Sequence, residues 1–223
     1  MRYLISFLKN TVVSTFLNAW KAFFALIIFV FCVFISNTHA QLAVTNTMTP
    51  TQLVQNVLVG GGVTISNVTY TGGANSKGSF TNGATTNLGL GSGIVLTTGT
   101  VTQTANAATY FMNVNLGLAG NAQLNAINNG TSTFDACILE FDFVPLSDTV
   151  KFRYVFGSEE YPNWVCSQYQ DIFAFFVNGP NPAGGNYTNY NIALIPGTSL
   201  PVSVNSVNNG SVGTSVKSSF FNE

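Results

Sequence analysis

Short stretches of alternating hydrophobic and polar residues dominate the chain after residue 40. Alternation with a period of two predicts strands that turn one face to a core and the other to solvent. We predict strands at Val63–Tyr70, Gly93–Thr98, Ala136–Phe143, Thr149–Phe156, Ile172–Asn178, Asn191–Ile195 and Val202–Val207. Short strands without intervening helices indicate a mostly β fold of the β-sandwich or jelly-roll type.

One short N-terminal helix interrupts this pattern. The sequence Thr49-Pro50-Thr51-Gln52 has the form of a capping box with proline at the first helical position. Hydrophobic residues then follow at helical spacing, and Gly60-Gly61-Gly62 ends the helix. A second helical turn is predicted near Gln123–Ile127.

The first 40 residues have a different pattern. A hydrophobic run of 14 residues, Ala22–Ile35, follows a segment whose charges are Arg2, Lys9 and Lys21. It is shorter than the ~20 residues that span a bilayer. Thr38-x-Ala40 fits the small-residue requirement of signal peptidase. We predict a secretory signal peptide at 1–40, cleavage near Ala40-Gln41 and an extracellular or outer-surface location; an uncleaved membrane anchor is the alternative.

Charge is scarce in the remaining domain, 41–223. It holds four of the seven Lys and Arg residues and all eight acids, so its net charge is −4. No basic patch is available to meet phosphates, which argues against nucleic-acid binding. The single histidine, His39, lies in the predicted signal peptide, so a histidine-based triad or metal site is also excluded.

Two cysteines remain after the predicted cleavage, Cys137 and Cys166. An even pair in an exported protein suggests a disulfide. We predict this bond between them, tethering the loop that contains Cys166.

Two neighbouring runs, 136–143 and 149–156, alternate so cleanly that they predict an antiparallel hairpin. The register that matches their hydrophobic faces places Glu140 opposite Arg153 and Asp142 opposite Lys151. Opposite charges across a strand pair are stabilising. The hairpin would therefore give these two acids a structural role.

Four other acids are predicted to gather at one end of this hairpin. Glu159 and Glu160 stand side by side in FGSEEYPNWVCSQYQD (156–171), and Asp135 and Asp171 are expected at the same edge. No cation is placed to neutralise them. Three interpretations are open: a solvated cluster, an oxygen-rich Ca²⁺ site, or a glycosidase-like pair of carboxyl groups.

Several blocks carry a resemblance to a known family. They are TPTQLVQNVLVGGGVTISNVTYTG (49–72), GLGSGIVLTTG (89–99), DACILEFDFVP (135–145), YVFGSEEYPNWVCSQYQDIFAFFVNGP (154–180) and NIALIPGTSLPVSVNSVNNG (191–210). With these blocks the chain resembles the choice-of-anchor L domain of bacterial secreted and surface proteins. The resemblance implies an exported protein without an established catalytic activity. It also implies that the family's domain continues further, so we expect 41–223 to be incomplete at its C-terminus.

The leading functional hypothesis is a non-enzymatic module at the cell surface or in the medium. It would serve in adhesion or bind surface glycans or other extracellular polymers through Tyr161 and Trp164, and Ca²⁺ would stabilise it. One alternative is a carbohydrate-active hydrolase that uses Glu159 or Glu160 with Asp171. A second alternative is a passive structural spacer.

Overall fold

The computed structural model describes residues 20–21, 23–24, 41–59, 63–106, 114–146, 149–208 and 210. The chain divides into two compact units, Met1–Ala40 and Gln41–Glu223. The four described residues of the first unit are helical. Most of the predicted signal peptide therefore lies outside the described residues, as does the stretch 211–223. Within the described part, no helix is long and hydrophobic enough to span a membrane.

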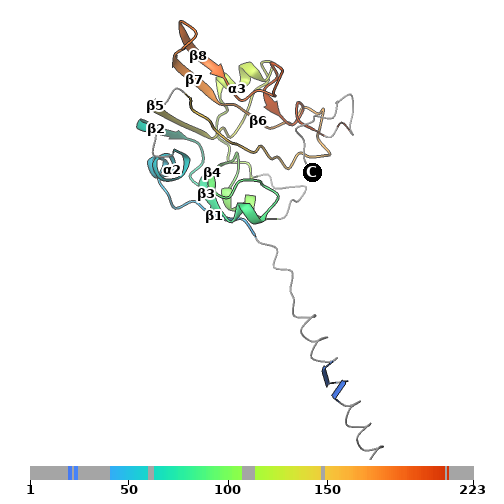
Figure 1. Cartoon of the computed structure of the whole chain (residues 1–223). Coiled ribbons are helices and arrows are strands. Elements are labelled where there is room, and N and C mark those ends of the chain that lie inside the picture. The colour runs from blue at the N-terminus through green and yellow to red at the C-terminus, as the bar shows by residue number, and fades with distance from the viewer. Residues whose placement is uncertain are drawn as a thin grey trace, which may run out of the picture. The chain divides into compact units, whose positions relative to one another are not determined.

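The mostly β class predicted from the sequence is confirmed in the second unit (Figure 1). Its described strands are short and pair in four small antiparallel sheets, ordered β1-β3-β4, β2-β5, β6-β9 and β7-β8. The strands are β1 (Ala43–Thr45), β2 (Val63–Thr71), β3 (Lys77–Thr81), β4 (Gly93–Leu96), β5 (Ile138–Pro145), β6 (Ile172–Phe173), β7 (Phe176–Pro180), β8 (Asn186–Asn191) and β9 (Val202–Ser203).

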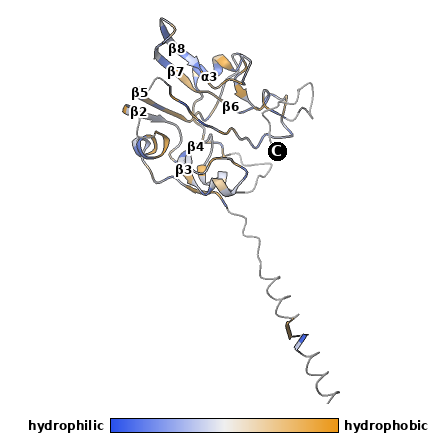
Figure 2. Cartoon of the chain, in the orientation of Figure 1, coloured by the Kyte–Doolittle hydropathy of each residue, from blue (hydrophilic) through white to orange (hydrophobic). Residues whose placement is uncertain are grey.

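The predicted N-terminal helix is confirmed as α2 (Pro50–Leu53), which continues into a π-helical turn, Val54–Leu58. Both halves of the capping box form: the Gln52 amide donates to the Thr49 hydroxyl, and the Thr49 amide donates to the Gln52 side chain. In Figure 2 this turn is hydrophilic on one side and hydrophobic on the other. Leu53 and Val54 supply the hydrophobic side and are fully buried.

The predicted helical turn in the middle of the chain is confirmed as α3 (Ala122–Ile127). The Asn121 side chain caps it by accepting hydrogen bonds from the amides of Gln123 and Leu124. On its exposed side, Gln123 Nε2 donates to Asn189 Oδ1 at 2.7 Å. This bond joins α3 to the β7–β8 hairpin, whose strand β8 is coloured hydrophilic in Figure 2.

The predicted hairpin between 136–143 and 149–156 is wrong. The alternation of β5 is as expected, but its partner is β2, with Ile65 opposite Phe143 and Tyr70 opposite Leu139. Residues 149–156 are not assigned to a strand. The predicted ion pairs are replaced accordingly: Asp142 accepts from Asn67 Nδ2 at 2.6 Å, and Arg153 donates to the Gly89 carbonyl at 2.9 Å.

The buried hydrophobic residues come from the whole length of the second unit. Their side chains expose at most 8% of their surface. They are Leu53, Val54, Phe80, Val101, Ala136, Val165, Ala193, Ile195, Val202 and Val204. The core therefore reaches the loop that carries the paired glutamates, because Val165 lies in that loop.

Candidate functional site

The paired glutamates lie in a loop of residues 158–171, here called the acidic loop, which runs into β6. Asp171 directly precedes β6, and its carbonyl accepts from the Val204 amide just after β9, at 3.1 Å. The Ser158 hydroxyl donates to Asp171 Oδ2 at 2.6 Å and accepts from the Glu160 amide at 3.1 Å. One hydroxyl thus links the start of the acidic loop to its end.

Further contacts fix the middle of the acidic loop against residues 204–208. The Tyr161 hydroxyl donates to the Val207 carbonyl. The Cys166 amide donates to Asn205 Oδ1 at 2.6 Å, and Asn205 Nδ2 donates back to the Ser167 carbonyl at 3.3 Å. These bonds, together with the buried Val165, give the loop a defined shape.

Three of the four predicted acids lie close enough to influence one another. Burial raises the pKa of Asp171, although the hydrogen bond from Ser158 offsets part of this effect. Burial also raises the pKa of Glu160, and the negative charges of Asp171 and Glu159 add to the effect. The pKa of Tyr161 is raised to about 12 by burial and by Asp171. Asp171 is therefore the centre of this group.

Asp135 has a different role from the one predicted. Its carboxylate accepts hydrogen bonds from the backbone amides of Leu116 at 3.0 Å and Leu118 at 2.6 Å. Through the described residues, no group of three or more His, Cys, Asp or Glu side chains is arranged to hold a metal ion. The four-carboxylate arrangement expected from the sequence is thus not assembled, because Asp135 instead serves to hold the 116–118 segment.

The predicted Cys137–Cys166 disulfide is not formed; both cysteines are free thiols. The Cys137 thiol donates to the Ser76 carbonyl at 3.2 Å and lies 3.4 Å from the Tyr70 hydroxyl. Burial raises the pKa of this thiol. Cys166, by contrast, is exposed in the acidic loop. Hydrogen bonds through Asn205 hold that part of the loop instead.

The two predicted ligand-binding aromatic residues also differ from each other. Tyr161 is half-buried and its hydroxyl holds the loop, whereas Trp164 is 40% exposed. Trp164 meets Tyr169, itself 52% exposed, in an edge-to-face contact with ring centroids 5.2 Å apart and planes at 82°. The Tyr169 amide donates to Ser167 Oγ, which helps to set its position. Sequence reasoning missed Tyr169, since nothing in the spacing of a loop shows which aromatic rings will meet.

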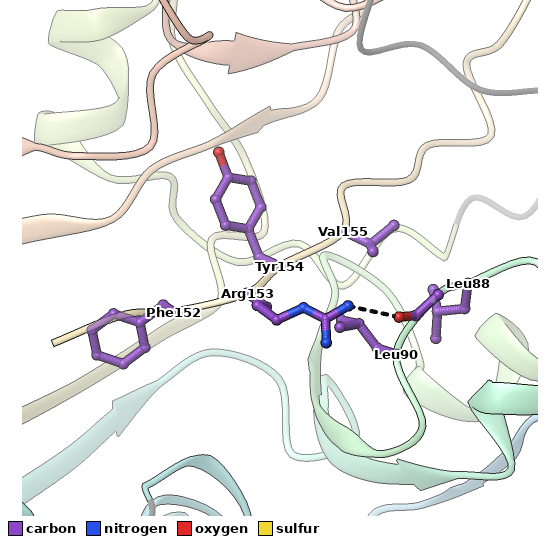
Figure 3. Close-up of a pocket in the computed structure, with 7 residues that line it drawn as sticks. Leu88, Leu90, Phe152, Arg153, Tyr154 and Val155 are labelled. Atoms are coloured by element: carbon purple, nitrogen blue, oxygen red, sulfur yellow. Dashed lines mark hydrogen bonds between the residues drawn. The ribbon is translucent and has the colours of Figure 1, made fainter.

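Sequence reasoning also missed a pocket away from the acidic loop. Its volume is about 370 Å³, and Figure 3 shows it between the loop at Leu88–Leu90 and the segment 152–155. Arg153 closes one side with its hydrogen bond to Gly89. The pocket thus does not contain the acids considered for hydrolysis.

The partly buried carboxyl groups of Glu160 and Asp171 predict a pH-dependent stability. Because the pKa values of Glu160 and Asp171 are raised, the folded state binds more protons than the unfolded state above the ordinary carboxyl pKa of about 4. The free energy of unfolding should therefore fall as the pH rises from 4 through the raised values. Asp171→Asn retains an acceptor for Ser158, should reduce this fall, and should stabilise the neutral-pH protein by on the order of 1 kcal/mol, about 2–4 °C.

Thermal melting between pH 4 and pH 8 measures this effect. Glu140→Gln is the matched control, because Glu140 is exposed on β5, and it should keep the wild-type decline. A wild-type protein whose stability rises steadily over this range, or an Asp171→Asn variant with the same decline as the wild type, would contradict the assignment.

The comparisons with known proteins give one match. The family model of the Choice-of-anchor L domain matches residues 41–223. No curated protein and no solved structure matches the chain. The match covers all of the second unit, including the acidic loop and the pocket. The chain therefore belongs to the Choice-of-anchor L domain family, whose members are surface or secreted modules.

Proposed function

We propose that this surface or secreted module is a non-enzymatic binding domain that recognises glycans or similar extracellular polymers through the acidic loop. The contact between Trp164 and Tyr169 is the observation that carries the proposal. Single exposed hydrophobic residues are common on protein surfaces. Here two large aromatic rings are in contact, and both are exposed on a loop that many hydrogen bonds hold in place. Such a pair offers a preorganised surface for the apolar face of a sugar ring.

The charges around this aromatic pair favour an uncharged polymer. Glu159, Glu160 and Asp171 are near one another, and the domain as a whole is acidic. An anionic polymer would be repelled there. A neutral glycan can accept hydrogen bonds from the loop and donate its hydroxyl groups to the carboxylates. Hydrogen bonds to an ionised carboxylate are stronger than those between neutral groups. The family is also not a known enzyme family, which agrees with binding without turnover.

Calcium is retained as a secondary part of this proposal. Glu159, Glu160 and Asp171 are its candidate ligands, and Asp135 is not, since its carboxylate already accepts two backbone amides. Burial raises the pKa of Glu160, and repulsion from Asp171 and Glu159 raises it further; a bound cation would reduce that repulsion. It would have to draw the three side chains together, because the described residues form no ready metal group.

The test is the affinity of the full chain for a panel of soluble neutral polysaccharides, measured by affinity electrophoresis. Trp164→Ala should weaken binding at least about tenfold, which corresponds to 1.4 kcal/mol, because it removes the larger ring of the pair. Tyr190→Ala is the matched control, since Tyr190 is also an exposed aromatic residue, at 51% against 40% for Trp164, but lies on β8. Repeating the assay with millimolar calcium and with chelator tests the calcium part.

Three outcomes would contradict the proposal. Equal losses in Trp164→Ala and Tyr190→Ala would mean that binding is not localised to the acidic loop. Release of sugar fragments that stops in Glu160→Gln would favour the hydrolase alternative. The absence of both binding and hydrolysis over the whole panel would favour a passive spacer.

A further inference from the structure

Residues 150–157 form a segment that belongs to no assigned helix or strand. It contains a valine, a phenylalanine, a tyrosine and a second phenylalanine at alternate positions, which is a strand pattern. Yet no backbone hydrogen bond joins residues 150–157 to any other described residue. The segment has the sequence of a strand, and Figure 3 shows residues 152–155 as a drawn-out chain, but within the described residues it lacks a strand's partner.

Side chains hold this segment in place. The Phe152 ring lies 4.6 Å from the Phe175 ring, and the Tyr154 ring lies 5.0 Å from the Phe173 ring, centroid to centroid. Phe173 belongs to β6, and Phe175 directly precedes β7. On the other side, Arg153 Nη2 donates to the Gly89 carbonyl (Figure 3). The segment is thus positioned by its rings and one guanidinium, and no described residue pairs with its backbone groups.

Unpaired backbone groups along an extended segment form a template for another strand. None of residues 150–157 is proline, so each presents a donor and an acceptor. We propose that residues 150–156 accept an extended peptide segment of a partner protein as an added β-strand. Binding of this kind takes its affinity from main-chain hydrogen bonds and its specificity from pockets for alternate side chains.

The charges define the chemistry of that peptide. Lys151 and Arg153 stand two positions apart, and both are exposed. Arg153 has further N–H donors beyond the one that Gly89 accepts. A partner strand with acidic residues two positions apart would place a carboxylate opposite each cation. A second copy of the same segment fits less well. Antiparallel pairing centred on residue 152 would place Lys151 opposite Arg153, and pairing centred on residue 153 would place Arg153 opposite itself.

The pocket supplies a place for one apolar side chain of the peptide. It borders the segment along residues 152–155, and Leu88 and Leu90 line its far side. Val155 is 53% exposed at its edge. The partner strand is therefore expected to alternate acidic and apolar residues, with one apolar side chain in the pocket.

A labelled peptide with this pattern tests the proposal. The sequence Ile-Leu-Glu-Phe-Asp-Phe, taken from residues 138–143, has acids two positions apart between apolar residues. Its binding to the full chain is measured by fluorescence anisotropy. We expect saturable binding to the wild-type chain. The affinity should fall at least about tenfold in the double variant Lys151→Glu/Arg153→Glu. It should return when that variant is tested with a peptide in which lysine replaces both acids. Both changes are at exposed positions, and circular dichroism checks that the variant remains folded.

Two further measurements separate strand addition from simple charge attraction. A peptide N-methylated at alternate residues keeps its charges but cannot form the ladder, so it should not bind. Hydrogen exchange should show amide protection on peptide binding confined to residues 150–157. The proposal would be overturned if the N-methylated peptide bound as tightly as the unmodified one, or if amide protection appeared outside residues 150–157. It would also be overturned if the wild-type chain did not bind the peptide, or if the double variant bound it equally well.

Discussion

Replacing Leu53 with alanine is expected to destabilise the second unit by about 2–5 kcal/mol, the range for removing a buried leucine side chain. Leu53 is completely buried at the end of α2. The capping box fixes the start of this helix, so the backbone around Leu53 has little freedom to close the cavity that the change would leave. Urea denaturation followed by circular dichroism measures the loss as a lower midpoint at unchanged slope.

The same substitution at an exposed leucine provides the control. Leu146 follows β5 and is 73% exposed. Leu146→Ala should change the free energy of unfolding by no more than about 0.5 kcal/mol, as surface substitutions generally do. Similar losses for the two variants would show that α2 does not pack into the core as described.

Gly120→Ala is expected to have the second large effect, a loss of about 1–3 kcal/mol or more from overpacking. A methyl group on Gly120 would overlap the Thr133 carbonyl. The two chain segments meet at this point: Ala119 forms a bridge with Phe134, and the Asn121 amide donates to the Thr133 hydroxyl at 3.0 Å. Only a shift of one backbone against the other could make room.

Melting temperature measures this second effect, with about 2–4 °C per kcal/mol for a domain of this size. Gly91→Ala is the matched control. A methyl group there would meet only the Ala84 side chain, at an ordinary contact distance of 3.7 Å. Equal melting temperatures for the Gly120→Ala and Gly91→Ala variants would contradict the close approach of the two segments.

Local signals in the sequence were sufficient for the helix and for the strand faces. The capping box needs only residues 49–52, and the alternation of β5 is contained in eight residues. The partner of β5 could not be inferred in the same way. Residues 149–156 and residues 63–71 both offer an alternating face, and nearness in sequence favoured the wrong one. The match of faces sets a register only after the partner is known.

Strands β1, β3 and β8 are not predicted by the sequence, except for Asn191 at the end of β8. The sequence of β3 does not resemble a strand. In β3, Phe80 is the only hydrophobic residue, and Gly78 and Ser79 precede it. The structure explains the glycine: a methyl group at Gly78 would overlap the Thr45 carbonyl of β1. Close approach of β1 thus selected a small residue of low strand propensity.

The acids were misassigned for a different reason. From the sequence, cations are the expected partners of Glu140 and Asp142, and a metal ion is one possible partner of Asp135. The structure uses neutral N–H groups instead: backbone amides for Asp135 and the Asn67 side chain for Asp142. Such partners leave no charge signal in the sequence. The placement of Glu159, Glu160 and Asp171 near one another was foreseeable, since they flank a single loop.

The network that holds the acidic loop has a consequence for the surroundings in which the protein can act. Its bonds through Tyr161, Cys166, Ser167 and Asn205 join partners that carry no net charge. Dissolved ions screen interactions between charges and have little effect on neutral hydrogen bonds. The bond from Ser158 to the Asp171 carboxylate is the part of the network that has a charged partner. Residues 161–167, which the neutral bonds hold, should therefore keep their shape in dilute and in concentrated salt alike, and the Trp164 ring among them would be presented in the same geometry in fresh water and in brine.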